Sequence, residues 1–257
     1  MTGDMTSSFC LTGKTVVVTG GASGIGAGIA WVLAEAGATV VITDINLAKA
    51  AEEAARLTEA GHLAAAVHID VAEEASIVRG CGEIVSARGA PWALVNNAGV
   101  QDRELLLQWT AAEWDRMNAI NGRGPFLMTR EIARAMVAAG QGGRIVNIAS
   151  TALIGSLIKG LAAYAGSKGA LLGLGRASAL ELAEHAITVN TVLPGGVATP
   201  GAIGARGPPA EGPARRRPPL GMCEPRDIGA AVLFFVSPAA RHVTNQALAV
   251  DAGWSVS

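Results

Sequence analysis

The residues best suited to chemistry are Tyr164, the only tyrosine in the chain, and Lys168, four residues later. Because positions four apart share a helix face, an ammonium group would stand beside the phenol. A neighbouring positive charge stabilises the phenolate and lowers the tyrosine pKa from about 10, which suits a general base or acid. The same pairing also occurs on ordinary helix surfaces, so it defines a candidate only.

A hydroxyl group closes the apolar run that precedes this pair. Residues 145–149 read as a buried strand, and Ser150 follows them directly. At the end of a strand, its hydroxyl could hydrogen-bond a substrate oxygen.

A glycine-rich turn near the start of the chain predicts a phosphate site. Residues 19–26 read TGGASGIG and join the first expected strand to the first expected helix. Glycine lets the backbone turn sharply and approach a pyrophosphate, which the helix N-terminus then holds. Of this turn, Gly20, Ser23, Gly24, Ile25 and Gly26 are the expected contacts. The alternative is a glycine turn that serves helix–sheet packing alone.

Asp44 favours NAD over NADP. It ends the second expected strand, 18 residues after Gly26, where a carboxylate can accept hydrogen bonds from ribose hydroxyls. The same carboxylate would repel a 2′-phosphate, and positions 23, 45 and 46 hold no Arg or Lys to receive one. The alternative is that Asp44 caps the following helix.

The next two expected strands also end in polar residues. Asp70 and Val71 follow the third strand, and residues 96–99, with sequence NNAG, close the fourth. Ligands of doubly wound sheets bind beyond the carboxyl ends of the strands, so these residues should face the same crevice. A turn or cap is the alternative role for Asp70.

Apolar runs alternate with helical periodicity along the whole chain, which predicts an α/β fold. We expect a single Rossmann-type domain over residues 1–257, with a doubly wound parallel sheet of about seven strands covered by helices on both faces. The expected strands are 15–19, 39–43, 64–69, 93–95, 144–148, 188–193 and 247–250, and the expected helices are near 25–36, 46–60, 73–88, 113–138, 163–184 and 225–236.

Composition excludes several classes of protein. Twenty Lys and Arg against 21 Asp and Glu give a net charge of −1, so no polyanion such as DNA or RNA is an expected partner. The three cysteines are far apart, which favours a reducing cytoplasm, and the four histidines show no metal-ligand spacing. The apolar run 16–43 resembles a membrane span, but its glycines favour strand, turn, helix and strand.

Residues 200–221 have a different texture, with six of the eleven prolines and no periodicity. A loop of this length is typical of a mobile lid over a substrate site. It carries Arg206, Arg215, Arg216 and Arg217. The arginines either remain solvated or recognise an anionic group of the substrate.

Taken together in order, these motifs resemble the short-chain dehydrogenase/reductase superfamily, in its NAD-dependent branch of about 250 residues. The resemblance covers residues 11–254, and its pieces are Thr19-Gly20, Gly24-Ile25-Gly26, Asp70, Asn96-Asn97-Ala98-Gly99, Asn121, Ser150, Tyr164 with Lys168, and Pro194-Gly195.

The resemblance implies a role for each site residue. Tyr164 would exchange the proton with the substrate oxygen, Ser150 would position that oxygen, Lys168 would bind the nicotinamide ribose and lower the tyrosine pKa, and Asn121 would hold a relay water. Further cofactor contacts would come from Asp70, Val71, Asn97, Ala98, Gly99, Pro194, Gly195, Val197 and Thr199.

Three positions depart from the family pattern. Ser150 precedes Tyr164 by 14 residues, one more than is usual, so Thr151 is an alternative to it. Ala252 stands in a C-terminal turn where the family has glycine, which would alter that turn. Gly196 replaces a larger residue after Pro194-Gly195, which would widen the site.

Two features of the helices carry further predictions. Pro125 cannot donate to the carbonyl of Asn121, so we expect a kink with that carbonyl turned to a relay water; the alternative is a helix that restarts at Pro125. Small residues recur along 162–177, which favours close helix packing. The resemblance implies a homodimer or homotetramer built there, and packing on the subunit's own sheet is the alternative.

The expected function is NAD-dependent interconversion of a secondary alcohol and a ketone, on a sugar or polyol, a cyclic alcohol or a hydroxysteroid. A carbonyl reductase that runs mainly in the reducing direction is the alternative within this class. A non-catalytic NAD-binding protein on the same fold is the alternative from another class, but such a protein would be expected to lose the Ser150, Tyr164 and Lys168 set.

Overall fold

The computed structural model describes residues 8–155, 157–199, 204–212 and 217–256. Its strands are β1 (Thr15–Thr19), β2 (Thr39–Asp44), β3 (Leu63–His68), β4 (Ala93–Asn96), β5 (Gly143–Ile148), β6 (Ile187–Pro194) and β7 (Ala247–Val250). The main helices are α1 (Gly24–Glu35), α2 (Leu47–Glu59), α3 (Glu74–Arg88), α4 (Ala111–Asn118), α5 (Gly124–Ala139), α6 (Ala162–Leu182) and α8 (Pro225–Val236).

All strand pairings in the sheet are parallel, in the order β3-β2-β1-β4-β5-β6-β7. The expected α/β fold and its seven strands are confirmed, and each strand begins and ends within one residue of its expected position. Because the chain reverses its direction of winding between β1 and β4, the carboxyl ends of these strands flank the crevice where such sheets bind ligands.

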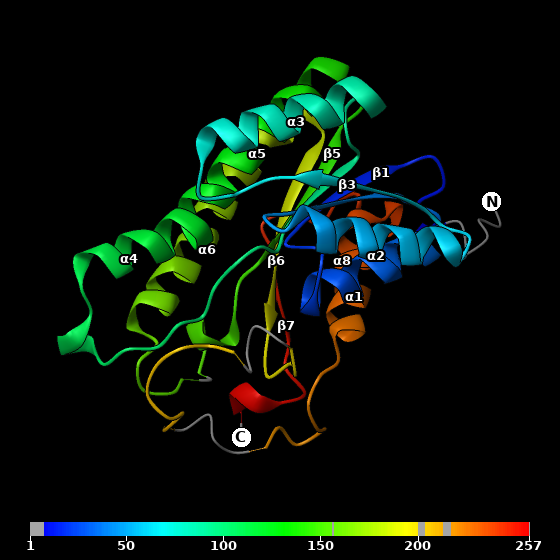
Figure 1. The fold of residues 1–257 in the computed structure, drawn as a ribbon. Coiled ribbons are helices and arrows are strands. Elements are labelled where there is room, and N and C mark those ends of the chain that lie inside the picture. The colour runs from blue at the N-terminus through cyan, green and yellow to red at the C-terminus, as the bar shows by residue number, and fades with distance from the viewer. Residues whose placement is uncertain (1–7, 156, 200–203, 213–216, 257) are drawn as a thin grey trace.

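Helices cover both faces of the sheet (Figure 1). On one face, α1, α2 and α8 bury Ile29, Leu57 and Phe235 against the strands. On the other face, α3, α5 and α6 bury residues such as Ile84 and Met128. The central strands are therefore covered above and below, which explains why they read as continuous apolar runs rather than as alternating ones, whereas the edge strands β3 and β7 are partly exposed.

The apolar run 16–43 forms β1, the glycine turn, α1 and β2, as expected. No helix among the residues that the structure describes is long and apolar enough to cross a membrane.

The segment expected as one helix over 113–138 is divided into three parts. A capping box of Thr110 and Glu113 starts α4. A π-helical turn follows over Ala119–Arg123, closed by a bond from the Gly124 N–H to the carbonyl of Ala119. Pro125 then lies in the first turn of α5, where its missing N–H costs nothing.

The regular helix is thus interrupted around Asn121 by the π-helical turn, and α5 starts at Gly124 with the proline in its first turn, as the alternative expected. The kink itself and the water contact of the Asn121 carbonyl remain predictions.

Candidate active site

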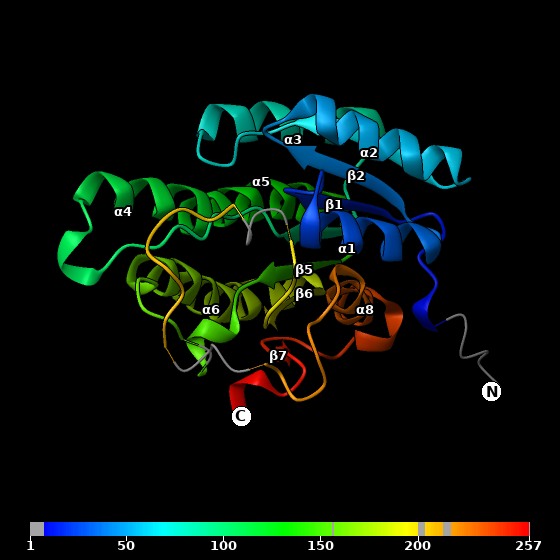
Figure 2. The same ribbon diagram turned by 60° about the horizontal axis from the view of Figure 1, so that its bottom comes forward.

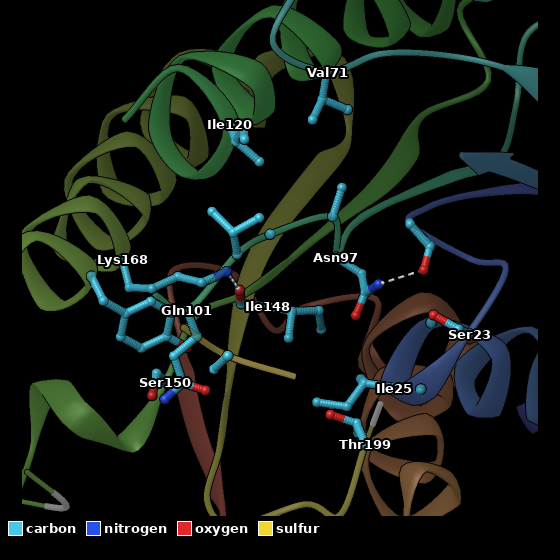
Figure 3. Close-up of a pocket in the computed structure, with 18 of the residues that line it drawn as sticks. Ser23, Ile25, Val71, Asn97, Gln101, Ile120, Ile148, Ser150, Lys168 and Thr199 are labelled. Carbon is cyan, nitrogen blue, oxygen red and sulfur yellow. Dashed lines mark hydrogen bonds between the residues drawn. The ribbon is translucent and has the colours of Figure 1, made fainter. Parts of the chain in front are cut away.

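A cavity of about 660 Å³ opens at the carboxyl edge of the sheet, where β1, β2, β4, β5 and β6 end (Figure 3). The structure brings together at its wall almost every residue singled out in the sequence, namely Gly20, Ser23, Gly24, Ile25, Gly26, Asp44, Asp70, Val71, Asn97, Ala98, Gly99, Ser150, Tyr164, Lys168, Pro194, Gly195, Val197 and Thr199. Asn121 is fully buried behind this wall.

Two glycines of the turn after β1 are required by close backbone contacts. Gly20 has a φ of +62°, and a Cβ there would lie 2.8 Å from Cα of Ala98. A Cβ on Gly26 would lie 2.1 Å from the carbonyl oxygen of Gly20. Side chains at these positions would force apart the turn and the end of β4, so the glycines keep the backbone next to the cavity.

Asn97 fastens the end of β4 to this turn. Its Nδ2 donates to the carbonyl oxygens of Thr19 and Gly20, at 2.9 and 3.1 Å. Asn97 and Gly20 both line the cavity, so the second bond joins two parts of its wall. The hydroxyl of Thr19 accepts the backbone N–H groups of Asn97 and Ala98, both at 3.0 Å. The amide of Asn97 is therefore committed to building the turn.

The N-terminus of α1 faces the same space, since Ser23, Gly24, Ile25 and Gly26 all line it. The Ser23 side chain makes no capping hydrogen bond, so it does not occupy the first N–H groups of α1. A side-chain-free cradle at a helix N-terminus fits the pyrophosphate of a dinucleotide. The residues present therefore fit a nicotinamide dinucleotide.

Asp44 and Asp70 line the cavity next to the glycine turn and the end of β3. The Asp44 carboxylate accepts the N–H of Asn46 at 3.0 Å and that of Ala22 at 3.3 Å, so it is fixed between the β2 end and the glycine turn. Asp70 accepts the N–H of Ala72 at 2.9 Å. Asp70 therefore shapes the turn after β3 and lines the cavity at once, so the two roles considered for it are compatible.

Tyr164, Ser150 and Lys168 meet at the other end of the cavity (Figure 3). Tyr164 and Lys168 lie one turn apart on α6 with 8% and 4% of their surfaces exposed. Ser150 lies two residues after the end of β5 and hydrogen-bonds the phenol. Thr151 instead donates to the carbonyl oxygen of Pro194 and is buried, so the arrangement favours Ser150 as the hydroxyl that faces substrate.

The expected lowering of the tyrosine pKa is wrong for the protein without cofactor. Burial raises the pKa of Tyr164, and the hydrogen bond from Ser150 opposes this only in part. Burial also lowers the pKa of Lys168 to about 8. Lys168 does not offset the burial because its Nζ donates to the carbonyl oxygen of Ile148, at 2.8 Å, instead of to the phenol.

Asn121 holds the loop after β4 in place. Its Oδ1 accepts the N–H of Val100 and its Nδ2 donates to the Val100 carbonyl oxygen, both at 2.9 Å. Nδ2 also donates to Oγ of Ser167 at 3.0 Å. The side-chain amide of Asn121 is thus occupied by protein partners, and its backbone carbonyl lacks the usual helical donor four residues later because that residue is Pro125.

The structure shows what happens at two positions where the sequence departs from the family pattern, Ala252 and Gly196. Ala252 adopts a φ of +54°, so the turn is kept with an alanine in a left-handed conformation. The expectation that Gly196 widens the site is wrong. A Cβ there would lie 2.8 Å from both Met222 and Trp254, so these side chains occupy the space that a larger residue would fill.

Sequence reasoning missed most of the wall beyond the catalytic group. Gln101, Asp102, Arg116 and Ile120 line it, together with Gly204, Ala205 and Arg206 from the expected lid. Of these residues only Arg206 was named from the sequence. The others carry no motif of their own, since the loop after β4, the helical segment 111–123 and the stretch 204–206 are brought together only by the fold. Of the other lid arginines, Arg217 is exposed and does not line the cavity, and Arg215 and Arg216 lie outside the described residues.

Residues 204–212, which belong to the segment expected as a lid, pack against two other loops. The N–H of Arg103 donates to the carbonyl oxygen of Arg206 at 2.8 Å, and the N–H of Lys159 donates to that of Glu211 at 2.6 Å. Gly207 allows the approach, because a Cβ there would lie 1.9 Å from the Arg103 carbonyl oxygen. Figure 2 shows this stretch, in gold, on the side of the molecule that carries α4 and α6.

Comparison with known proteins agrees with the geometry. A family described as "Enoyl-(Acyl carrier protein) reductase" matches residues 12–255. The chain is 36% identical to sorbitol dehydrogenase of Cereibacter sphaeroides, over 95% of this chain and 98% of that protein. It is also 36% identical to cyclopentanol dehydrogenase of Comamonas testosteroni, over 95% and 98%.

Solved structures show the same fold. A gluconate 5-dehydrogenase from Burkholderia cenocepacia, in complex with NADP and tartrate, superposes with a TM-score of 0.89 at 31% identity, covering 99% of this chain and 100% of that one. With the ordered motifs, the parallel sheet and the whole-length matches in agreement, the chain belongs to the short-chain dehydrogenase/reductase superfamily of nicotinamide-dependent oxidoreductases.

Proposed function

We propose that this protein is an NAD-dependent dehydrogenase that oxidises a secondary alcohol to a ketone, with Tyr164 as the general base. The observation that carries the proposal is the placement of Ser150, Tyr164 and Lys168 at one end of a cavity whose other end is a glycine cradle beside Asp44. The two ends match the two partners of a hydride transfer, an alcohol and a dinucleotide.

The chain's own residues would handle the proton. A bound nicotinamide ring supplies the hydride acceptor. Tyr164, as phenolate, takes the hydroxyl proton of the alcohol while the carbinol carbon–hydrogen bond breaks and the C=O bond forms. Ser150 hydrogen-bonds the same oxygen and fixes it near the phenol. Lys168 would hold the nicotinamide ribose, and its charge would favour the phenolate once that ribose draws Nζ away from Ile148.

NAD is the proposed cofactor because of Asp44. Its carboxylate stands at the adenosine end of the cavity, fixed by two backbone N–H groups, and would repel a 2′-phosphate. The solved gluconate 5-dehydrogenase binds NADP, so the family itself does not decide the choice. Asp44→Ala should weaken NAD binding and narrow the gap to NADP, measured by quenching of tryptophan fluorescence. Equal use of NADPH and NADH by the wild type would contradict this proposal.

The activity is tested by following reduced nicotinamide with polyols, cyclic alcohols and hydroxysteroids as substrates. Wild type should reduce NAD with at least one of them, and Tyr164→Phe should abolish turnover while NAD binding stays nearly intact. Substantial turnover by the Tyr164→Phe variant would overturn the role of the phenol. Preference for the ketone and NADH under the same conditions would favour the alternative, a carbonyl reductase.

We also propose that the enzyme is a cytoplasmic homodimer or homotetramer built on α5 and α6. The small residues expected to pack closely on α6, among them Ala162, Gly166, Gly173 and Ala177, are exposed, so the alternative of packing on the subunit's own sheet does not apply to them. An apolar groove beside them is lined by Phe126, Ala133, Val137 and Leu182. Light scattering at micromolar concentration tests the assembly, and a monomer would refute it.

A further inference from the structure

The far end of the cavity, beyond the phenol of Tyr164, has a strongly polar wall. Gln101 and Asp102 come from the loop after β4, Arg116 comes from α4, and Arg206 comes from the docked lid. Ile120 also lines the cavity, but it lies near Val71, away from Gln101 (Figure 3). A substrate whose reacting carbinol lies at Tyr164 would direct the rest of its body toward this wall.

Asp102 is the centre of this wall. Its Oδ2 binds Nη2 of Arg116 directly and lies 3.8 Å from Nη2 of Arg206. Its Oδ1 accepts the backbone N–H of Arg206 at 3.3 Å. The carboxylate keeps 19% of its side-chain surface exposed, and the guanidinium groups of Arg116 and Arg206 keep 40% and 81%. All three can therefore still be reached by a ligand.

The charges around the wall partly offset each other. Two guanidinium groups face the carboxylate of Asp102, and Glu113 stands behind them on α4. Hydrogen bonds from Thr110 are the main reason that the pKa of Glu113 is low, and the charges of Arg116 and Arg206 lower it further. Within the cavity lining, Arg116 and Arg206 thus face one carboxylate, and Glu113, which lies outside the lining, offsets part of the remaining positive charge that could attract an anionic substrate.

A wall of this kind suits hydroxyl groups. A hydroxyl both donates and accepts, so it can bridge a carboxylate oxygen and a guanidinium N–H in one step. A carboxylate in the same place would gain from the arginines but lie against Asp102. An apolar ring would cover the ion pairs and offer them no hydrogen bond. The charged groups would then lose their bound water and gain no new partner, which lowers the affinity for such a substrate.

We infer that the substrate is an uncharged polyhydroxylated compound, a sugar alcohol or sugar, whose distal hydroxyls bind Asp102, Arg116 and Arg206, and that Asp102 determines this specificity. The inference rests on the proposed dehydrogenase function and selects among its substrates. It also replaces the expectation that lid arginines recognise an anion.

The first test compares three alcohols with NAD and the wild-type enzyme: a hexitol, the matching aldonate, and cyclopentanol. The expected order of kcat/KM places the hexitol at least tenfold above both others. A preference for the aldonate would overturn the inference in favour of anion recognition. A preference for cyclopentanol would overturn it in favour of an apolar site, and in both cases the dehydrogenase function would stand. No oxidation of any alcohol in the wider panel would overturn the function and the inference together.

The second test changes the wall. Asp102→Leu should lower kcat/KM for the hexitol at least tenfold, mainly by raising KM. The kcat/KM for cyclopentanol should stay the same or rise. Asp102→Asn, which keeps an acceptor oxygen of the same size, should recover part of the hexitol activity. Arg206→Ala removes a side chain that is exposed and that folding does not need. It should lower kcat/KM for the hexitol and leave kcat/KM for cyclopentanol unchanged.

The matched control is Arg79→Ala, which removes an exposed arginine on α3 that does not line the cavity. This variant should have the same kcat/KM as the wild type for all three substrates. NAD binding, followed by tryptophan fluorescence, should be unaltered in every variant, which separates a substrate effect from loss of the fold. An equal loss of hexitol and cyclopentanol activity in Asp102→Leu and Arg206→Ala would overturn the inference.

Discussion

Ser167 Oγ accepts a hydrogen bond from Nδ2 of Asn121 at 3.0 Å and donates its own to the carbonyl oxygen of Tyr164 at 2.8 Å. One fully buried hydroxyl therefore ties the π-helical turn to the helix that carries the phenol and the lysine. Asn121 in turn holds both backbone groups of Val100, so Ser167 fixes the distance between the loop after β4 and α6.

Ser167→Ala should leave an Nδ2 hydrogen of Asn121 buried without an acceptor. We expect the free energy of unfolding to fall by about 1–3 kcal/mol. We also expect kcat to fall roughly tenfold, with a shifted pH profile, because the turn at Asn121 loses its support. Ser178→Ala on the same helix is the control, since Ser178 is partly exposed and outside the cavity. Unchanged stability and kcat in Ser167→Ala would show that this bond is dispensable.

Tyr164 can be titrated alone because the chain has no other phenol. Without cofactor, the ultraviolet absorbance of tyrosinate should appear above pH 10, since burial raises the pKa. NAD⁺ should move the transition downward, because it brings positive charge to the site. Ser150→Ala should move it upward in the free enzyme, because it removes the hydrogen bond that opposes burial. A transition below pH 10 in the free enzyme would contradict the role assigned to burial.

Lys168 should make stability depend on pH in a defined window. Its pKa is about 8 in the folded protein against 10.5 for an ordinary lysine. Below pH 8 both states carry the charge and the full cost of burying it is present. Between about pH 8 and 10.5 only the unfolded chain keeps the proton, so the folded state gains stability as pH rises, by up to about 3 kcal/mol.

The comparison with Lys168→Met isolates this effect, because the variant keeps Cys81, whose buried thiol has a pKa of about 12, and Tyr164. Urea unfolding of both proteins at about pH 7 and about pH 10 gives the difference in the free energy of unfolding. The wild type should gain stability relative to the Lys168→Met variant when the pH rises from about 7 to about 10. A difference that does not change with pH would mean that Lys168 is not buried as described.

Gly207→Ala should displace the lid. The new Cβ would lie 1.9 Å from the carbonyl oxygen of Arg103, so the stretch 204–212 would have to leave its dock. We expect KM for the alcohol to rise roughly tenfold, equivalent to about 1.4 kcal/mol, with NAD binding unchanged.

Gly221→Ala is the matched control for the lid. Its φ of +93° also strains an alanine, but nothing lies within 4 Å of the new Cβ. It should therefore leave KM close to the wild-type value. Equal effects of the two variants would mean that backbone strain, and not the clash with Arg103, is responsible.

The parts of the site that sequence reasoning predicted are those set by local patterns. Asp44 ends β2, and Asp70 and Asn97 follow within two residues of the ends of β3 and β4, and the parallel sheet brings these strand ends to one edge. The interruption near Asn121 was also predictable, because a proline removes a specific backbone bond. Such features need no knowledge of distant contacts.

The parts that could not be predicted depend on packing between distant segments. The pKa of Tyr164 shifts upward because of how deeply α6 and β5 bury it, and no spacing of residues reports that depth. Asp102, Arg116 and Arg206 come from three segments that meet only in the folded chain. The space beside Gly196 is filled by Met222 and Trp254, which lie 26 and 58 positions further along the chain.

The order of strands has a consequence for how the protein is made. At the centre of the sheet, β1 pairs with β4, and Asn97 at the end of β4 closes the turn that follows β1. Tyr164 and Lys168 come later still, on α6, and Pro194 at the end of β6 and Gly195 after it complete the cavity wall. During synthesis, a chain that has left the ribosome only as far as α3 holds the glycine turn and Asp44 without the wall opposite them. Dinucleotide binding therefore cannot assist the folding of the first half, and it becomes available as a stabilising ligand only when most of the chain has emerged.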